Sequence, residues 1–190
     1  MVNRLGREEW LRASRLALLK GGVEAVRVEK LARDLKVTKG SFYWHFKDRA
    51  EILEALLGEW ERELSGIAAR LQGTTGRDRI LSLLAILADL AKLSGRGRAP
   101  SDAAIFAWAA VSPEVARRVN KAERERIKFL AGLTKSVDQA EILYMTWLGF
   151  VARGQRIPQS RKKFPRLARA LLDVVLCEPR ASRRNRREAI

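Results

Sequence analysis

The chain has 190 residues and a net charge of +16, so it can bury a sizeable core and favours an anionic partner such as nucleic acid or a membrane surface. Its only cysteine, Cys177, excludes an intramolecular disulfide and fits a reducing compartment, while its only histidine, His45, argues against a histidine metal cluster or a His-dependent catalytic triad. We therefore expect a cytoplasmic protein that is not an enzyme, with no catalytic residues, no metal site and no cofactor.

The first predicted helix covers residues 7–20 and ends at two consecutive glycines. Trp10 lies on its apolar face and is expected in the core, because apolar residues recur there at helical spacing. Arg12 and Arg15 are expected to point toward solvent.

Residues 31–49, LARDLKVTKGSFYWHFKDR, are typical of two short helices joined by a tight turn. Apolar residues at i, i+3, i+4 and i+7 mark one face of the first of these helices. Thr38 stands where it can cap the second helix, with its hydroxyl accepting from the backbone N–H of Ser41. Phe42 and Phe46, four residues apart, form the only strongly apolar edge of the second helix.

The opposite side of that second helix carries hydroxyl, aromatic, imidazole and ammonium groups. A short helix that is anchored by two phenylalanines and exposes such groups is suited to a polar, anionic surface. On spacing alone, a surface helix-turn-helix with scattered aromatic residues is the alternative interpretation.

The string KGSFYWHFKDR, with LARDLKV before it and AEIL after it, resembles the DNA-reading element of the TetR (tetracycline-repressor-like) transcriptional regulators. By this resemblance the helix over 38–46 is the recognition helix. The family usually begins the preceding helix with Thr or Ser, where this chain has Val28, so Arg27 or Lys30 is expected to supply the phosphate contact. The DNA-binding residues that the resemblance implies are Arg27, Lys30, Thr38, Lys39, Gly40, Ser41, Tyr43, Trp44, His45 and Lys47.

A long helix is predicted from Asp48, as its N-cap, to about residue 71, with Glu51 completing a capping box. Its apolar residues alternate at steps of four and three over nearly seven turns, so one continuous stripe faces other helices. The helix begins at the head and must end in the body, which makes it the physical connection between the two.

The rest of the chain is predicted to be helical, with caps at Thr75, Ser101, Ser112 and Ser136. The segment 94–100, SGRGRAP, is expected to be a mobile linker, and the charged segment 117–128 is expected to be mostly solvated. The predicted helices are 76–93, 101–110, 113–133, 137–153 and 165–177.

The helices 137–153 and 165–177 carry more apolar surface than one small body can cover, which indicates a partner subunit. The TetR resemblance implies the same homodimer, because in that family the last two long helices pair with their copies in a four-helix bundle. The expected interface residues are Leu143, Trp147, Leu148, Val151, Leu167, Leu171, Leu172 and Val175.

A ligand site in the body has to be lined from three segments, 83–90, 105–108 and 144–150. Aromatic and aliphatic residues there can form walls and a few polar groups can orient a ligand, although ordinary core packing is the competing interpretation of each residue. The candidate lining is Leu87, Asp89, Leu90, Phe106, Trp108, Tyr144, Met145, Trp147 and Phe150.

These elements predict an all-α fold: a three-helix head with a helix-turn-helix at about 30–49, a long connecting helix, and a helical body for ligand binding and dimerisation. Length alone allows one domain or two; the expected division is 1–48 for the head, 49–178 for the body and 179–190 for a basic, disordered tail. Residues 1–50 carry a net charge of +6 and residues 153–190 carry +9, whereas the middle is nearly balanced and is not expected to contact nucleic acid.

The predicted function is a dimeric repressor of transcription that binds a pseudo-palindromic double-stranded operator and is released from it by a small-molecule effector. No membrane partner is expected, because the longest apolar run, 80–93, is shorter than a membrane span and is interrupted by polar residues. The alternative is a DNA-binding structural or cell-cycle factor on the same fold that has no effector.

Overall fold

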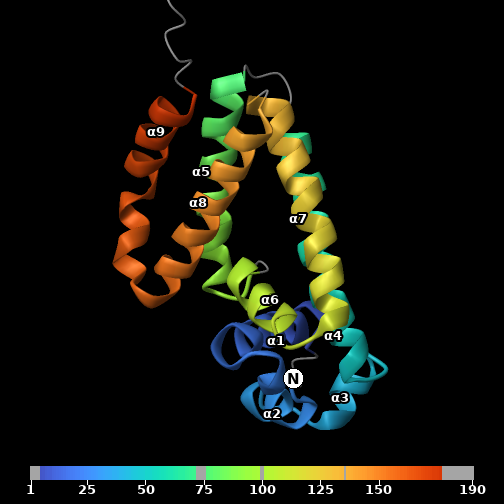
Figure 1. Cartoon of the computed structure of the whole chain (residues 1–190). Helices are drawn as coiled ribbons and strands as arrows, with labels where there is room; N and C mark the ends of the chain where they lie inside the picture. Colours follow the sequence, from blue (N-terminus) through green and yellow to red (C-terminus); the bar gives the residue numbers. More distant parts are fainter. Residues whose placement is uncertain (1–4, 72–75, 99–100, 135, 177–190) are drawn as a thin grey trace, which may run out of the picture.

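The computed structural model describes residues 5–71, 76–98, 101–134 and 136–176, and every regular element in these ranges is helical. Three helices form a head and six form a body that stands on it (Figure 1). The predicted all-α architecture of head, long connecting helix and helical body is therefore confirmed. Thr75 and the basic tail lie outside the described residues. The elements are α1 (Arg7–Gly21), η1 (Val23–Ala25), α2 (Val28–Asp34), α3 (Lys39–Tyr43), α4 (Arg49–Arg70), α5 (Gly76–Ser94), α6 (Asp102–Ala109), α7 (Pro113–Thr134), α8 (Val137–Arg156), η2 (Pro158–Lys163) and α9 (Phe164–Val175).

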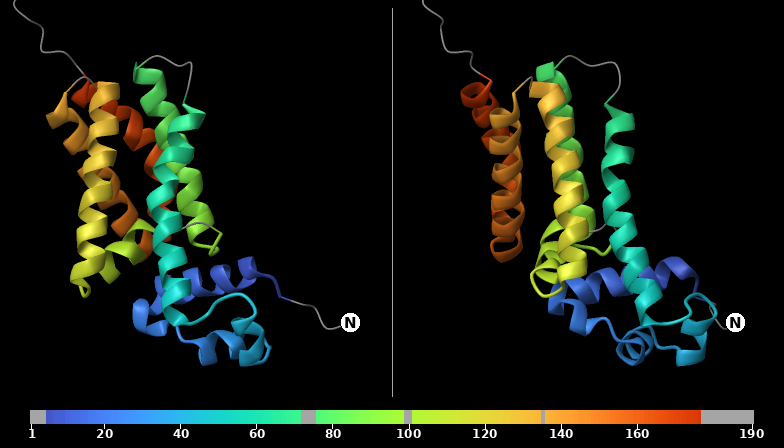
Figure 2. Two further views of the ribbon diagram at one scale, coloured as in Figure 1. Left: turned by 90° about the vertical axis from the view of Figure 1, so that its right-hand side faces the viewer. Right: turned by 45° about the vertical axis from the view of Figure 1, so that its right-hand side comes forward.

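Helix α4 joins the head to the body, and Figure 2 shows it rising from the head to the far end of the upright helices. The Asp48 side chain caps it by accepting from the Glu51 N–H at 2.9 Å, as predicted. The Glu51 carboxylate accepts from the backbone N–H of Lys47 at 2.6 Å, one residue before the cap. A full capping box would have the Glu51 carboxylate accept from the backbone N–H of Asp48, so that part of the prediction was wrong. The observed bond instead holds the residue that precedes the N-cap.

The turn between α2 and α3 is a Schellman motif. The Lys36 N–H bonds to the Arg33 carbonyl at 3.1 Å and the Val37 N–H bonds to the Ala32 carbonyl at 3.0 Å. Lys36 occupies the left-handed position of this motif, with φ of 57°, which is where glycine is usual. The motif ends α2 and sets the direction in which the chain continues to α3.

Two apolar clusters hold the molecule together. The lower cluster contains the fully buried Trp10, Phe42 and Trp60, and the predicted core position of Trp10 is thereby confirmed. It also contains Trp108 of α6 and Val119 of α7, so the head shares its core with the lower part of the body. The upper cluster lies between α4, α5, α7, α8 and α9.

Arg15 was predicted to face solvent, but it is only 7% exposed. Its Nε donates to the Gly97 carbonyl at 2.7 Å, and its guanidinium also pairs with Glu8 and with Glu59 of α4. Gly97, with φ of 68°, lies so close to α1 that a Cβ there would be 2.8 Å from the Arg12 carbonyl. The described part of the predicted mobile linker is therefore held against the head, because a buried guanidinium needs acceptors on every side.

Candidate nucleic-acid interface and body cavity

The side of α3 that was predicted to face DNA is open to solvent. Trp44 is 84% exposed and Tyr43 is 58% exposed, which is unusual for large aromatic side chains in a well-packed head. Lys39 and Gly40 are also exposed, and Ser41 is half-buried. The head thus presents aromatic, hydroxyl and ammonium groups together on one short helix.

The buried side of α3 fixes this surface in place. Phe42 is fully buried, meets the Trp10 ring edge-on at 5.2 Å between centroids, and stacks on Phe46 at 5.4 Å. The guanidinium of Arg7 lies over the Phe46 ring at 4.7 Å. Such aromatic contacts add to the burial energy of the rings and restrict the angle of the helix.

Helix α3 is shorter than predicted. It ends at Tyr43, and Trp44 and His45 form a turn before Phe46, whose N–H bonds to the Phe42 carbonyl at 3.0 Å. The buried Phe46 lies only two residues before Asp48, the cap of α4, so the chain turns between the two helices here.

Thr38 occupies the N-cap position of α3, but its side chain makes no capping bond. The Ser41 N–H bonds to the Thr38 backbone carbonyl at 3.1 Å, so the predicted hydroxyl cap was wrong. The exposed Thr38 side chain therefore takes no part in capping α3.

Two of the side chains predicted to face DNA from residues 38–46 have polar partners within the chain. Lys39 Nζ lies 2.8 Å from Glu29 Oε1, and this hydrogen bond lowers the pKa of the Glu29 carboxyl. His45 Nε2 lies 2.8 Å from the Leu5 carbonyl. An exposed ion pair contributes little to stability, so Lys39 can exchange Glu29 for a phosphate at small cost.

The three remaining predicted cations lie on the surface of the head. Arg27, Lys30 and Lys47 are all exposed, and the Arg27 Nε donates to the Glu24 carbonyl at 3.0 Å. The sequence analysis did not single out Arg49, whose guanidinium donates to backbone carbonyls between α1 and α2, 2.7 Å away in each case. Arg49 therefore connects the start of α4 to the segment between α1 and α2.

A cavity of about 60 Å³ lies within the body. Three of the nine predicted lining residues, Leu87, Tyr144 and Trp147, do line it. Its walls come from five helices, and the full lining is Glu63, Ile67, Ile80, Leu83, Leu84, Leu87, Asp102, Arg126, Phe129, Leu130, Leu143, Tyr144 and Trp147.

The other six predicted lining residues lie elsewhere. Asp89 is on the surface and pairs with Lys92, and Met145 is largely exposed. Leu90 is partly buried in the upper cluster. The three aromatic residues pack in the core. Phe106 contacts Trp60, Trp108 belongs to the lower cluster, and Phe150 contacts Phe164.

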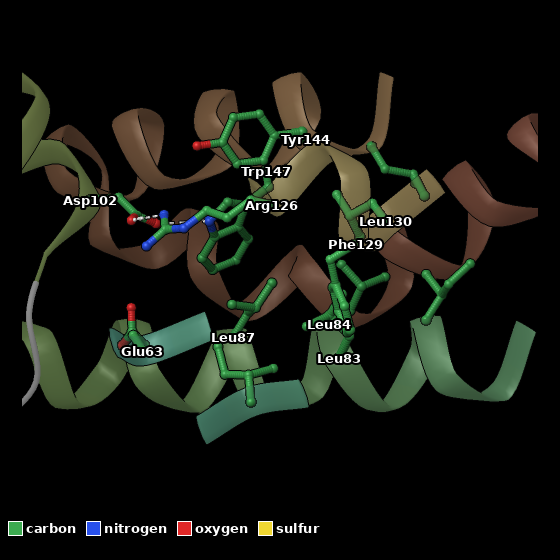
Figure 3. Close-up of a pocket in the computed structure, with 13 residues that line it drawn as sticks. Glu63, Leu83, Leu84, Leu87, Asp102, Arg126, Phe129, Leu130, Tyr144 and Trp147 are labelled. Carbon is green, nitrogen blue, oxygen red and sulfur yellow. Dashed lines mark hydrogen bonds and ion pairs between the residues drawn. The ribbon is translucent and has the colours of Figure 1, made fainter. Parts of the chain in front are cut away.

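The polar end of the cavity is organised by Asp102, the first residue of α6. Its carboxylate accepts from Trp60 Nε1 at 2.7 Å, from Arg126 at 2.9 Å and from Trp147 Nε1 at 2.9 Å. The Arg126 guanidinium also lies 4.1 Å from the centre of the Trp60 ring. Figure 3 shows Asp102, Arg126 and Glu63 gathered at one end of the cavity, away from Leu83 and Phe129.

Glu63 and Tyr144 are the other polar groups of this site. Burial raises the pKa of Glu63 to about 7, the nearby Asp102 charge adds to the rise, and Arg126 opposes it. Burial also raises the pKa of Tyr144. The Tyr144 hydroxyl is buried and has no hydrogen-bond partner of ordinary geometry among the described residues.

Sequence reasoning missed Glu63, Asp102 and Arg126. The segment containing Arg126 was predicted to be solvated, yet the Arg126 and Asp102 side chains are 11% and 10% exposed. No periodic pattern could have found them, because Arg126 lies among charged neighbours and its partner comes from a different helix.

Comparison with known proteins identifies the head. Residues 11–56, from α1 into α4, match the model of bacterial regulatory proteins of the tetR family. The head is that of a TetR-family regulator. The match covers α2 and α3, and so includes the helix whose exposed side was predicted to face DNA.

Solved structures extend the TetR fold to the body. A transcriptional regulator from Rhodococcus sp. Rha1 has a TM-score of 0.64 and 20% identity, covering 90% of this chain and 94% of its own. A TetR-family regulator from Streptomyces coelicolor has a TM-score of 0.67 and 16% identity, covering 90% and 91%. The fatty acid degradation regulator FadR from Bacillus halodurans has a TM-score of 0.65 and 15% identity, covering 92% and 96%. No curated protein matches the chain.

None of the described helices combines the length and apolar character that crossing a membrane requires. Within the same residues, no group of three or more His, Cys, Asp or Glu side chains is placed to hold a metal ion.

Proposed function

We propose that the protein is a dimeric repressor that binds a pseudo-palindromic operator through α3 and is released by a small molecule bound in the body. The observation that carries the DNA-binding part is the pair Tyr43 and Trp44, exposed at the end of α3, whose other side is held in the core by Phe42. In this proposal residues 1–48 read the DNA and residues 49–178 bind the effector and the partner subunit. Arg27, Lys30, Lys39 and the other predicted polar residues of the head supply the contacts to phosphates and bases.

The proposed dimer is supported by apolar side chains that α8 and α9 leave exposed. Met145 is 65% exposed, Leu167 is 51% and Val174 is 76%. Such side chains on two adjacent helices favour burial against a second copy.

The predicted interface residues divide by burial. Leu143, Trp147 and Leu172 are buried in the subunit's own core, so they hold α8 and α9 in place and do not contact the partner directly. Leu148, Val151, Leu171 and Val175 are partly buried in the upper cluster, and Leu167 is exposed. In our proposal the contact with the partner is therefore made by the outer sides of α8 and α9.

Release of the operator by an effector requires contacts that couple the cavity to the head. Asp102 at the cavity stands at the start of α6, and α6 packs against α1 and α4. Arg15 ties α1 to the segment just before α6 through the Gly97 carbonyl. A ligand that binds one position of α6 better than another can shift α6 and the head that packs against it. Dimers of this motif read half-sites about 34 Å apart. A small change in the spacing of the two heads therefore weakens operator binding.

Selection of double-stranded DNA from a random pool tests this proposal. We expect enrichment of a pseudo-palindrome whose half-sites are about one helical turn apart. A protein carrying Tyr43→Ala and Trp44→Ala should keep its fold and enrich no sequence. Enrichment of the same sequence by this double variant would contradict the assignment of α3.

The cavity size favours the alternative of a DNA-binding factor without an effector. Its volume of about 60 Å³ is well below the roughly 300 Å³ of an ordinary small-molecule site. If no ligand of the cavity alters operator affinity, this alternative replaces the effector-released repressor. If a cavity ligand lowers operator affinity, the alternative is excluded.

A further inference from the structure

The body cavity has a polar end and an apolar end. Figure 3 shows Glu63, Asp102 and Arg126 at one end and Leu83, Phe129 and Leu130 toward the other. A molecule that fills this space therefore needs one polar group on an apolar body.

The Arg126 guanidinium, the positive charge at the polar end, already has partners within the protein. Arg126 pairs with Asp102 at 2.9 Å and lies against the Trp60 ring at 4.1 Å. The Asp102 carboxylate is in turn fully engaged by two indole N–H groups and Arg126. An anionic ligand would have to break this set, which is costly because it leaves a buried charge unpaired.

Glu63 is the one charged group of the described lining that has neither a hydrogen bond nor an ion pair. It projects from α4 on the side of the cavity opposite Tyr144 of α8, with Asp102 of α6 and Arg126 of α7 between them (Figure 3), while the α5 side of the cavity is aliphatic. With one arginine and two carboxylates, the polar end carries a net charge of −1 when Glu63 is ionised.

Tyr144 gives a second, independent indication of a ligand. Its side chain is 6% exposed, it lines the cavity, and its hydroxyl lacks a hydrogen-bond partner among the described residues. An unpaired buried hydroxyl is destabilising, so a ligand group that donates a hydrogen bond to it would recover part of that cost.

We infer that the cavity binds a slender hydrophobic amine, with its ammonium group at Glu63 and its alkyl part between α5 and α7. This inference rests on the proposed function in taking the cavity as the effector site. The cavity volume of about 60 Å³ is small, so a short unbranched chain is the appropriate size.

Calorimetry with the full-length protein at pH 8 tests the ligand class. The probes are three six-carbon compounds that differ only in the head group, n-hexylamine, hexanoate and hexanol, together with their eight-carbon counterparts. We expect the amine to bind at least tenfold more tightly than the carboxylate or the alcohol of equal length. Tighter binding of the carboxylate, or no binding at either chain length, would overturn the inference.

Glu63→Gln identifies the group responsible, because it keeps the shape of the side chain and removes the charge. We expect the preference for amine over alcohol to fall to within about twofold while alcohol binding is retained. The matched control is Glu125→Gln on the exposed side of α7, which changes the net charge equally and should leave the preference intact. An undiminished preference in Glu63→Gln would overturn the inference.

A pH series gives a readout that a purely structural role of Glu63 would not move. The pKa of Glu63 is about 7, so amine affinity should fall about tenfold from pH 8 to pH 6 as Glu63 becomes protonated. The amine itself stays charged over this range. The Glu63→Gln variant should show a flat profile, and a flat profile in the wild type would contradict the assignment.

Operator binding in the presence of n-hexylamine separates this inference from the proposed function. If the amine binds through Glu63 and leaves operator affinity unchanged, the inference stands and effector release fails. If operator binding is specific but no amine enters the cavity, the inference fails and DNA recognition stands.

Discussion

The indole N–H of Trp60 in α4 donates to the carboxylate of Asp102 at the start of α6, across 2.7 Å. Trp147 of α8 and Arg126 of α7 bond to the same carboxylate. One side chain thereby joins four helices at the boundary between the two apolar clusters. The position of α6 relative to the cavity depends on this carboxylate.

Asp102→Asn should lower the free energy of unfolding by about 3 kcal/mol, because it leaves the buried Arg126 charge without its counter-ion. Urea unfolding followed by circular dichroism measures the change. The matched control is Asp89→Asn, which removes one partner of an exposed ion pair with Lys92 and should cost less than about 0.5 kcal/mol. Equal effects of the two substitutions would contradict the central role of Asp102.

Tyr43→Ala and Trp44→Ala together should abolish specific operator binding and leave the melting temperature nearly unchanged, because both side chains are exposed. Fluorescence anisotropy with a labelled operator and thermal unfolding measure the two quantities. Phe42→Ala is the contrasting variant: it removes a fully buried ring and should destabilise the protein by about 3–5 kcal/mol. Loss of folding in the Tyr43, Trp44 variant would show that these rings serve the core.

Leu167→Glu with Val174→Glu should convert a dimer into folded monomers, because both side chains are exposed in the subunit and charge is costly in a buried interface. Sedimentation equilibrium at micromolar concentration measures the assembly. Val111→Glu, also exposed but outside α8 and α9, is the matched control and should remain dimeric. Leu172 is unsuitable for this test because it is fully buried within the subunit. A monomeric wild type would contradict the proposed dimer.

Glu63 should make the protein less stable as pH rises. Its pKa is raised to about 7 in the folded state, so between its ordinary value and 7 the folded protein binds more protons than the unfolded chain, and stability falls with rising pH. The penalty is absent below about pH 4 and reaches about 3 kcal/mol above pH 8. In urea unfolding from pH 5 to 8, the free energy of unfolding of Glu63→Gln should rise relative to that of the wild type. A difference between the two that does not change with pH would contradict the burial of the charge.

Lys36→Gly should stabilise the head by about 0.5–1 kcal/mol, because Lys36 holds the left-handed position of the Schellman motif with φ of 57°. The gain is limited by the greater freedom of glycine in the unfolded chain. Lys36→Ala is the control for loss of the charge and should not stabilise. Guanidinium unfolding measures both, and destabilisation by glycine would mean that the lysine side chain has a role of its own.

The head could be predicted from the sequence because its signals are local. Phe42 and Phe46 are four residues apart, and Asp48 caps α4 through a residue three positions away, so neighbouring residues carry the information. Trp10 could be placed in the core by helical spacing alone. The same locality explains why the caps and the order of the body helices were largely predictable.

Only the tertiary structure decided which charged residues are buried. Arg15 bonds to Gly97, which lies 82 positions away, and Arg126 bonds to Asp102 on another helix. A buried charge is tolerated only where its acceptors converge, and that convergence depends on packing between helices, which spacing along the chain does not report. The cavity has the same origin, since Glu63 of α4 and Tyr144 of α8 line one space only when these helices pack together.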